Sequence, residues 1–116
     1  MDKVLTKRQK LVAERILELL PRFVSGNEQN RSMLFEMGGL IRSISLEATE
    51  EESLDDSYWD LDLCYALMDD QKRNYFTESE EVTLKKAKSN ITRIIQNYLA
   101  LPPEPEDPYA WPEEYK

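Results

Sequence analysis

Three helix-start signals set the framework into which this chain can fold. Thr6-Lys7-Arg8-Gln9, Thr49-Glu50-Glu51-Glu52 and Thr77-Glu78-Ser79-Glu80 all read T-x-x-Q or T-x-x-E. In such a capping box, the threonine and the Gln or Glu three residues later satisfy free N–H groups at a helix start. The sequence therefore predicts helices that begin near residues 6, 49 and 77.

Apolar residues recur every three or four positions after each signal, and again between the first two, which gives four amphipathic helices. The second helix is expected from about Glu28 to Glu47, with Asn27 as its N-cap. We predict an all-α, four-helix bundle-like single domain. Its predicted core contains Val12, Ile16, Leu20, Leu34, Met37, Ile41, Leu61, Tyr65, Ile91, Ile94 and Tyr98.

Pro21 and the glycines modify this pattern. Pro21 has no N–H to donate, so the first helix either kinks there or stops at Leu20 and restarts. Gly26 is suited to a left-handed turn at the end of that unit. The Gly38-Gly39 pair, inside the second helix, predicts close helix packing or a kink.

A change of composition divides the chain. Residues 1–101 form the predicted helical domain, and 102–116 form a Pro-rich acidic tail that holds five of the six prolines. Such a segment is expected to be extended or polyproline-like. Trp111 and Tyr109 either return to the bundle or are offered to a partner.

Acidic residues are concentrated in the predicted third helix. Residues 47–70 contain ten acids and no base, in a protein whose net charge is −8. Like charges four apart destabilise a helix by about a few tenths of a kcal/mol per pair. Aromatic residues beside the acids are typical of binding interfaces. We therefore predict a surface for a basic protein partner, composed of Asp55, Asp56, Tyr58, Trp59, Asp60, Asp62, Asp69 and Asp70. Alternatively, the acids confer only solubility.

Trp59 and Leu63 are expected near the border between the apolar and acidic faces of this helix. The Asp55-x-x-Tyr58-Trp59 pattern resembles the acid and paired aromatics of colicin DNase immunity proteins. Trp59 stands where that family has a tyrosine, and the proline that follows there is absent, so the resemblance is an analogy and assigns no family. It implies an inhibitor whose basic partner is a nuclease toxin or another nucleic-acid-binding enzyme.

Residue types limit the available chemistry. The chain has no histidine and one cysteine, Cys64, which excludes Ser-His-Asp and Cys-His catalysis and thiolate zinc clusters. We predict a protein without enzymatic activity, metal or cofactor, in which Cys64 is a core residue. One enzyme alternative is an Mg²⁺-dependent all-α nucleotide pyrophosphohydrolase. Glu51 and Asp55 have a suitable spacing for it, but no convincing second acidic pair follows on another helix.

Charge and hydropathy also constrain partners and location. An acidic protein is not expected to bind nucleic acid or anionic membranes directly. No apolar run approaches 18 residues and no signal peptide is recognisable, so we expect no membrane span. With one cysteine, a cytoplasmic protein is expected. A structural or adaptor subunit, which forms helical oligomers through apolar helix faces, is the main alternative function.

Overall fold

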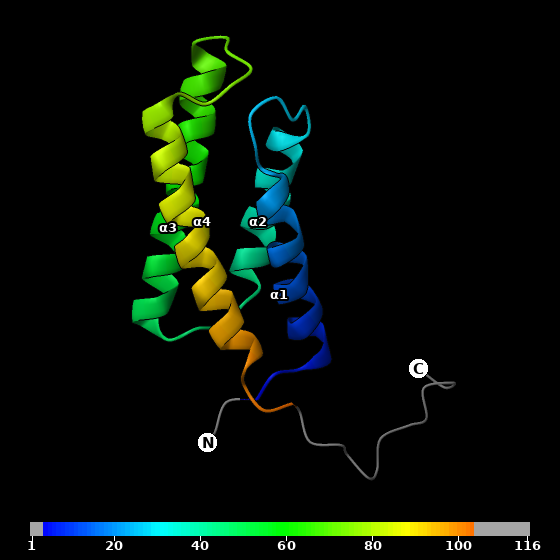
Figure 1. The fold of residues 1–116 in the computed structure, drawn as a ribbon. Coiled ribbons are helices and arrows are strands. Elements are labelled where there is room, and N and C mark those ends of the chain that lie inside the picture. Colours follow the sequence, from blue (N-terminus) through cyan, green and yellow to red (C-terminus); the bar gives the residue numbers. More distant parts are fainter. Residues whose placement is uncertain (1–3, 104–116) are drawn as a thin grey trace, which may run out of the picture.

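The computed structural model describes residues 4–103, and all regular secondary structure in this range is helical. The elements are α1 (Lys7–Leu19), a 3₁₀ turn η1 (Leu20–Arg22), α2 (Asn30–Arg42), α3 (Ala48–Asp70) and α4 (Glu78–Leu99). Figure 1 shows that the four α-helices run alternately up and down along the bundle. The predicted all-α, four-helix architecture is confirmed.

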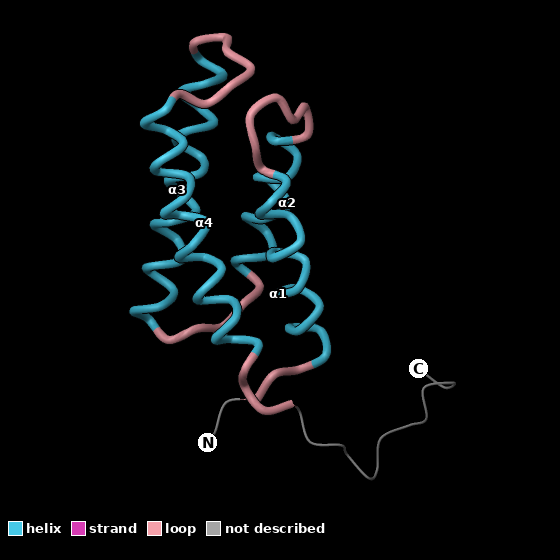
Figure 2. The backbone as a smooth tube through the Cα atoms, viewed as in Figure 1, coloured by secondary structure: helices cyan, strands magenta, loops and turns pink. Residues whose placement is uncertain are grey.

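Each helix contacts the next one in the chain, and α1 also contacts α4, which closes the bundle. The α3–α4 contact is the most extensive. Within it, Asn90 Nδ2 donates to Ser57 Oγ at 2.7 Å and to Ser53 Oγ at 2.9 Å. Figure 2 shows the α1–α2 and α3–α4 loops at one end of the bundle and the α2–α3 loop at the other. One side of α3 is therefore held against its neighbours while the opposite side faces solvent.

Two of the three predicted capping boxes are confirmed. Thr6 Oγ1 accepts from Gln9 N at 3.1 Å, and Gln9 Oε1 accepts from Thr6 N at 3.1 Å. Thr77 and Glu80 make the same reciprocal pair at the start of α4. These local hydrogen bonds fix the starts of α1 and α4 where the sequence predicts them.

The third box prediction is wrong. The helix α3 begins at Ala48, with Glu47 in an extended conformation as the N-cap, and no side chain caps it. Thr49 therefore lies inside the first turn. Ile44 is buried and Leu46 packs partly buried against the core, so apolar contacts decide where the chain turns into α3.

The predicted bounds of α2 are also wrong, because the helix spans only Asn30–Arg42. Asn27 is not its N-cap. Its Oδ1 accepts from Gln29 N at 2.9 Å and its Nδ2 donates to the Arg22 carbonyl at 2.7 Å, so it closes the preceding loop. Asparagine often competes with the helix in this way, through hydrogen bonds to nearby backbone. At the other end, the chain leaves the helix after Arg42, and Ile44 is buried in the loop that follows.

Pro21 ends the first helix. The sequence left open a kink at Pro21 or a stop at Leu20 followed by a restart. The α-helix stops one residue earlier, at Leu19, and the single 3₁₀ turn η1, which contains Pro21, follows it. The missing N–H and the bulk of the ring prevent another α-helical turn. Gly26 then adopts the predicted left-handed conformation, with φ of 81°.

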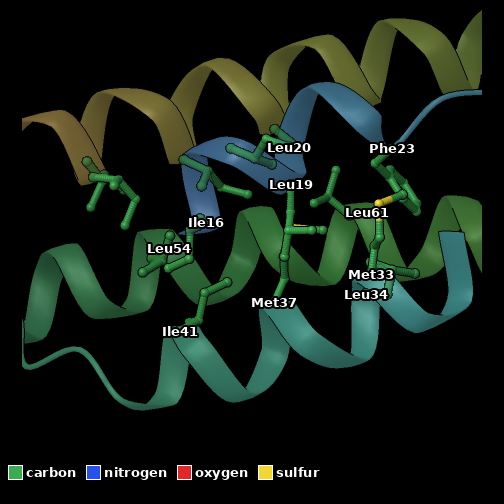
Figure 3. Close-up of a cluster of buried hydrophobic side chains, with 14 of the residues drawn as sticks. Ile16, Leu19, Leu20, Phe23, Met33, Leu34, Met37, Ile41, Leu54 and Leu61 are labelled. Atoms are coloured by element: carbon green, nitrogen blue, oxygen red, sulfur yellow. The ribbon is translucent and has the colours of Figure 1, made fainter. Parts of the chain in front are cut away.

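The predicted core is largely confirmed. Nine of its eleven members are buried, and Val12 and Tyr65 are partly buried at its margin. Figure 3 shows apolar side chains of α1, α2 and α3 pointing toward one another. Near the loops that join α1 to α2 and α3 to α4, Phe23 and Phe76 lie with ring centroids 5.4 Å apart. Apolar contact thus extends along the bundle to that end.

The two ends of the described chain meet at the end of the bundle that carries the α2–α3 loop (Figure 1). Leu5 N donates to the Pro102 carbonyl at 2.8 Å, and Leu5 forms an isolated bridge with Pro103. The description ends at Pro103, so the predictions for the tail, including those for Trp111 and Tyr109, lie outside the described residues. No helix within residues 4–103 combines the length and apolarity needed to cross a membrane.

Candidate protein-binding face

The six predicted aspartates all lie on α3. Asp55, Asp56, Asp60, Asp69 and Asp70 are exposed, whereas Asp62 is half-buried and faces the space between α2 and α3. The buried side of the same helix carries Leu54, Ser57, Leu61, Cys64 and Met68. Because core contacts fix which side is buried, the other five carboxylates are held on the outward surface of the bundle.

Apolar side chains lie among these carboxylates. Trp59 is 61% exposed, Leu63 is 56% exposed and Leu67 is 40% exposed. Their spacing of four places them along one line on the outward surface of α3. Trp59 and Leu63 therefore lie farther from the core than the predicted border position. Leu67 was missed, although its spacing from Leu63 could have indicated it.

Tyr58 is held between α2 and α3. Its Oη donates to the Leu34 carbonyl at 2.8 Å. A Cβ on Gly38 would lie 2.7 Å from Tyr58 Oη. Burial, followed by the nearby Asp62 carboxylate, raises the pKa of the phenol, while Arg42 acts in the opposite direction. Gly38 thus permits the close approach that the Gly38-Gly39 pair predicted.

The Tyr58 ring in turn supports the exposed tryptophan. The Tyr58 and Trp59 rings lie edge to face, with centroids 6.2 Å apart. Tyr58 and Trp59, the two aromatic residues of the predicted surface, have different surroundings. Tyr58 is hydrogen-bonded and half-buried, whereas Trp59 has most of its surface available for contact.

No carboxylate of α3 forms an ion pair with a base of the described residues. Ion pairs in that part of the chain include Arg15–Glu18, Arg15–Glu36, Arg22–Glu18 and Arg73–Glu80. None of them uses an acid of α3, although this helix carries nine acids and no base. Its charge is therefore directed to solvent rather than used to join helices.

The outward side of α3, with its aspartates and Trp59, is the candidate protein-binding face, and a groove beside Tyr58 extends this face onto α2. It has a volume of about 480 Å³ and is lined by Arg31, Ser32, Leu34, Phe35, Tyr58, Asp62 and Tyr65. Phe35 is 86% exposed, the highest value among the large apolar residues of the described chain. Sequence reasoning missed this groove. The sequence offered one indication of it, since Phe35 is an aromatic residue outside the buried positions of α2.

Within residues 4–103, no three His, Cys, Asp or Glu side chains come together as a set of metal ligands. Cys64 is only 3% exposed, as its predicted core role requires. Burial, together with the nearby Glu80, Asp60 and Glu81 carboxylates, raises the pKa of its thiol to about 11.

The fold and this surface define a four-helix bundle with an acidic face that has an aromatic residue among its carboxylates. Comparison with known proteins finds no matching family model, no similar curated protein and no similar solved structure. A functional proposal must therefore be argued from the residues of the face itself.

Proposed function

We propose that this protein is a non-enzymatic acidic binding protein that occludes a basic surface of a partner protein. The observation that carries the proposal is the outward side of α3, where Trp59 is exposed among aspartates that no ion pair of the described residues neutralises. The proposed partner is a nuclease toxin or another nucleic-acid-binding enzyme, whose active site or nucleic-acid groove would be covered.

The proposed mechanism has an electrostatic and a steric part. A concentrated negative surface speeds the encounter with a basic partner, and this acceleration falls as salt rises. An exposed tryptophan can then be buried at the centre of the interface, where aromatic residues contribute most binding energy. Direct nucleic-acid binding is not part of the proposal, because phosphates and these carboxylates repel one another. A cytoplasmic location remains part of it.

The proposal is tested with the triple variant Asp55→Asn, Asp62→Asn and Asp69→Asn. Immobilised wild type and variant would be exposed to host lysate at low and high salt, and bound proteins identified by mass spectrometry. We expect the wild type to retain a basic enzyme at low salt and to release it at high salt. The triple variant should not retain this enzyme at either salt concentration. Circular dichroism should show that the variant is folded.

A matched control removes the same charge elsewhere. Glu14, Glu28 and Glu78 are exposed and lie outside α3, so their replacement by Gln should leave the capture unchanged. Equal capture by the wild type and the α3 variant would refute the proposed role of the acidic face. Equal loss in the α3 and control variants would show that only net charge matters.

A second candidate function is a structural or adaptor subunit that forms helical oligomers. The observation that favours it is exposed apolar surface on helices other than α3, at Phe35 on α2 and Val82 on α4. Sedimentation velocity would support it by showing a stable, salt-insensitive oligomer. A third, weaker candidate is the Mg²⁺-dependent pyrophosphohydrolase. Calorimetric titration with Mg²⁺ tests it, and the absence of binding at Glu51 and Asp55 would remove it.

A further inference from the structure

We infer that the groove between α2 and α3 is the anchor pocket of the acidic face, and that it takes an apolar side chain from a basic helical segment of the partner. This inference rests on the proposed function, since it names the feature of the partner that the same face would recognise. It also adds α2 residues to a site that the charge pattern placed only on α3.

The pocket has the composition of an anchor site. Tyr58 and Tyr65 from α3 and Leu34 and Phe35 from α2 supply apolar and aromatic surface. Asp62 supplies a carboxylate and Arg31 a guanidinium. A volume of about 480 Å³ lies within the usual range for sites that enclose a ligand group. One aromatic or long aliphatic side chain can therefore be seated in this open groove.

One wall of the pocket is fixed before any partner arrives. The Tyr58 hydrogen bond to the Leu34 carbonyl, at 2.8 Å, ties α3 to α2, and the missing side chain at Gly38 allows the close approach. A preformed pocket loses less conformational entropy on binding than one that must be assembled. By contrast, Phe35 is almost fully exposed, so contact with a partner would bury most of its ring.

Charge decides what kind of segment the pocket takes. Asp62 lines the pocket, and Asp55 and Asp69 lie seven residues away on either side, on the same side of α3. Seven residues of α-helix span about 10.5 Å. A partner helix laid along α3 repeats at the same distance, so lysines or arginines seven residues apart can meet all three carboxylates.

The same charges disfavour other occupants. A second copy would bring nine acids of one α3 against nine of another, with no base on either helix. Arg31 also lies in the pocket wall, but an anionic small molecule would still meet three carboxylates, those of Asp62 and of Asp55 and Asp69 along the same side of α3, against this one guanidinium. The observations therefore favour a basic amphipathic helix, with its apolar residue about one turn from a central Lys or Arg, in a helix-in-groove mode.

Two synthetic helical peptides of equal charge test the inference. Both carry Lys at every seventh position over about five helical turns, and one has Phe where the other has Ala, about one turn from the central Lys. Fluorescence anisotropy would give their dissociation constants for the wild type and for Phe35→Ala. Exposed Phe35 makes few core contacts, so this variant should fold. Leu11→Ala, on α1, is the control, since Leu11 is 70% exposed and outside the groove.

We expect the Phe peptide to bind the wild type and Leu11→Ala about tenfold more tightly than the Ala peptide, as is typical of a buried aromatic anchor. Phe35→Ala should remove most of this preference. Amide chemical shifts of Ser32, Phe35 and Tyr65 should change only with the Phe peptide. Weaker binding of the Ala peptide to the triple Asp→Asn variant measures the charge contribution separately.

Several outcomes would overturn the inference in distinguishable ways. Equal, salt-sensitive binding of both peptides would exclude the pocket and leave the acidic-face proposal standing. A Phe preference that survives Phe35→Ala would place the apolar contact elsewhere. A dimer that Phe35→Ala dissociates would assign the groove to a second copy. Binding of neither peptide at low salt would contradict both the pocket and the proposed function.

Discussion

Two adjacent glycines in α2 have different surroundings, and their replacement by alanine tests how the binding face is held together. Apart from its chain neighbours and the backbone of its own helix, no atom lies within 4 Å of the position that a Cβ on Gly39 would occupy. A Cβ on Gly38 would lie 2.7 Å from Tyr58 Oη and 3.1 Å from Tyr58 Cζ. Gly39 is therefore a matched control for Gly38, one residue away in the same helix.

The two substitutions should change stability in opposite directions. Gly→Ala inside a helix gains about 1 kcal/mol of helix propensity, and Gly39→Ala should realise most of it. Gly38→Ala makes the same gain but disturbs the Tyr58–Leu34 hydrogen bond, worth about 1 kcal/mol, and overpacks the contact by about 1–3 kcal/mol. We expect Gly38→Ala to be about 1–3 kcal/mol less stable than wild type.

Urea unfolding followed by circular dichroism would measure the free energy of unfolding of both variants. Gly38→Ala would also be measured in a protein that carries Tyr58→Phe. Removal of the hydroxyl eliminates the closest contact, so Gly38→Ala should cost less in Tyr58→Phe than in the wild type. Trp59 fluorescence should also change in Gly38→Ala, since that ring lies edge to face with Tyr58. Equal stability of the two alanine variants would refute this account of the α2–α3 contact.

Three further predictions concern other parts of the bundle. Lys72 has a left-handed φ of 55° just after α3, so Lys72→Gly should raise the free energy of unfolding by about 0.5–1 kcal/mol in urea titrations, and a loss would contradict this. The Arg73 ion pair holds the pKa of Glu80 below its ordinary value of 4.5, so its contribution is present above pH 4.5 and is lost as pH falls through the folded-state value. Thermal unfolding across that range should show a smaller acid destabilisation in Glu80→Gln, and equal slopes would contradict the assignment. With a thiol pKa of about 11 and 3% exposure, Cys64 should react with a thiol reagent at neutral pH only after unfolding, and rapid labelling of the native protein would show that it is accessible.

The features that depend on local sequence were predictable. Helix number and the buried side of each helix follow from the apolar period, and the starts of α1 and α4 follow from capping boxes that act over three residues. The bounds of α2 and the start of α3 were not predictable from local sequence. They depend on the hydrogen bonds of Asn27 within a loop and on the burial of Ile44 after α2 ends.

The candidate face divides in the same way. Outward carboxylates on α3 were predictable, because the opposite side of that helix is apolar. The groove was not, since it depends on how closely α2 approaches α3 at Gly38 and Tyr58. Phe35 could have been noticed as an aromatic residue outside the buried stripe of α2, but only the packed structure shows that it lies beside Tyr58 and Tyr65 in one pocket.

The end of α3 offers the clearest separation of stability from binding. Asp69 and Asp70 lie in its last turn, where the helix dipole disfavours negative charge, and this turn holds no base. Asp69→Asn and Asp70→Asn should therefore each stabilise the fold by about a few tenths of a kcal/mol, measured by thermal or urea unfolding. If these residues bind a basic partner, as proposed, the same substitutions should weaken capture of that partner. A variant that loses stability would show that the two acids support the fold, and stabilisation with unchanged capture would remove them from the binding face.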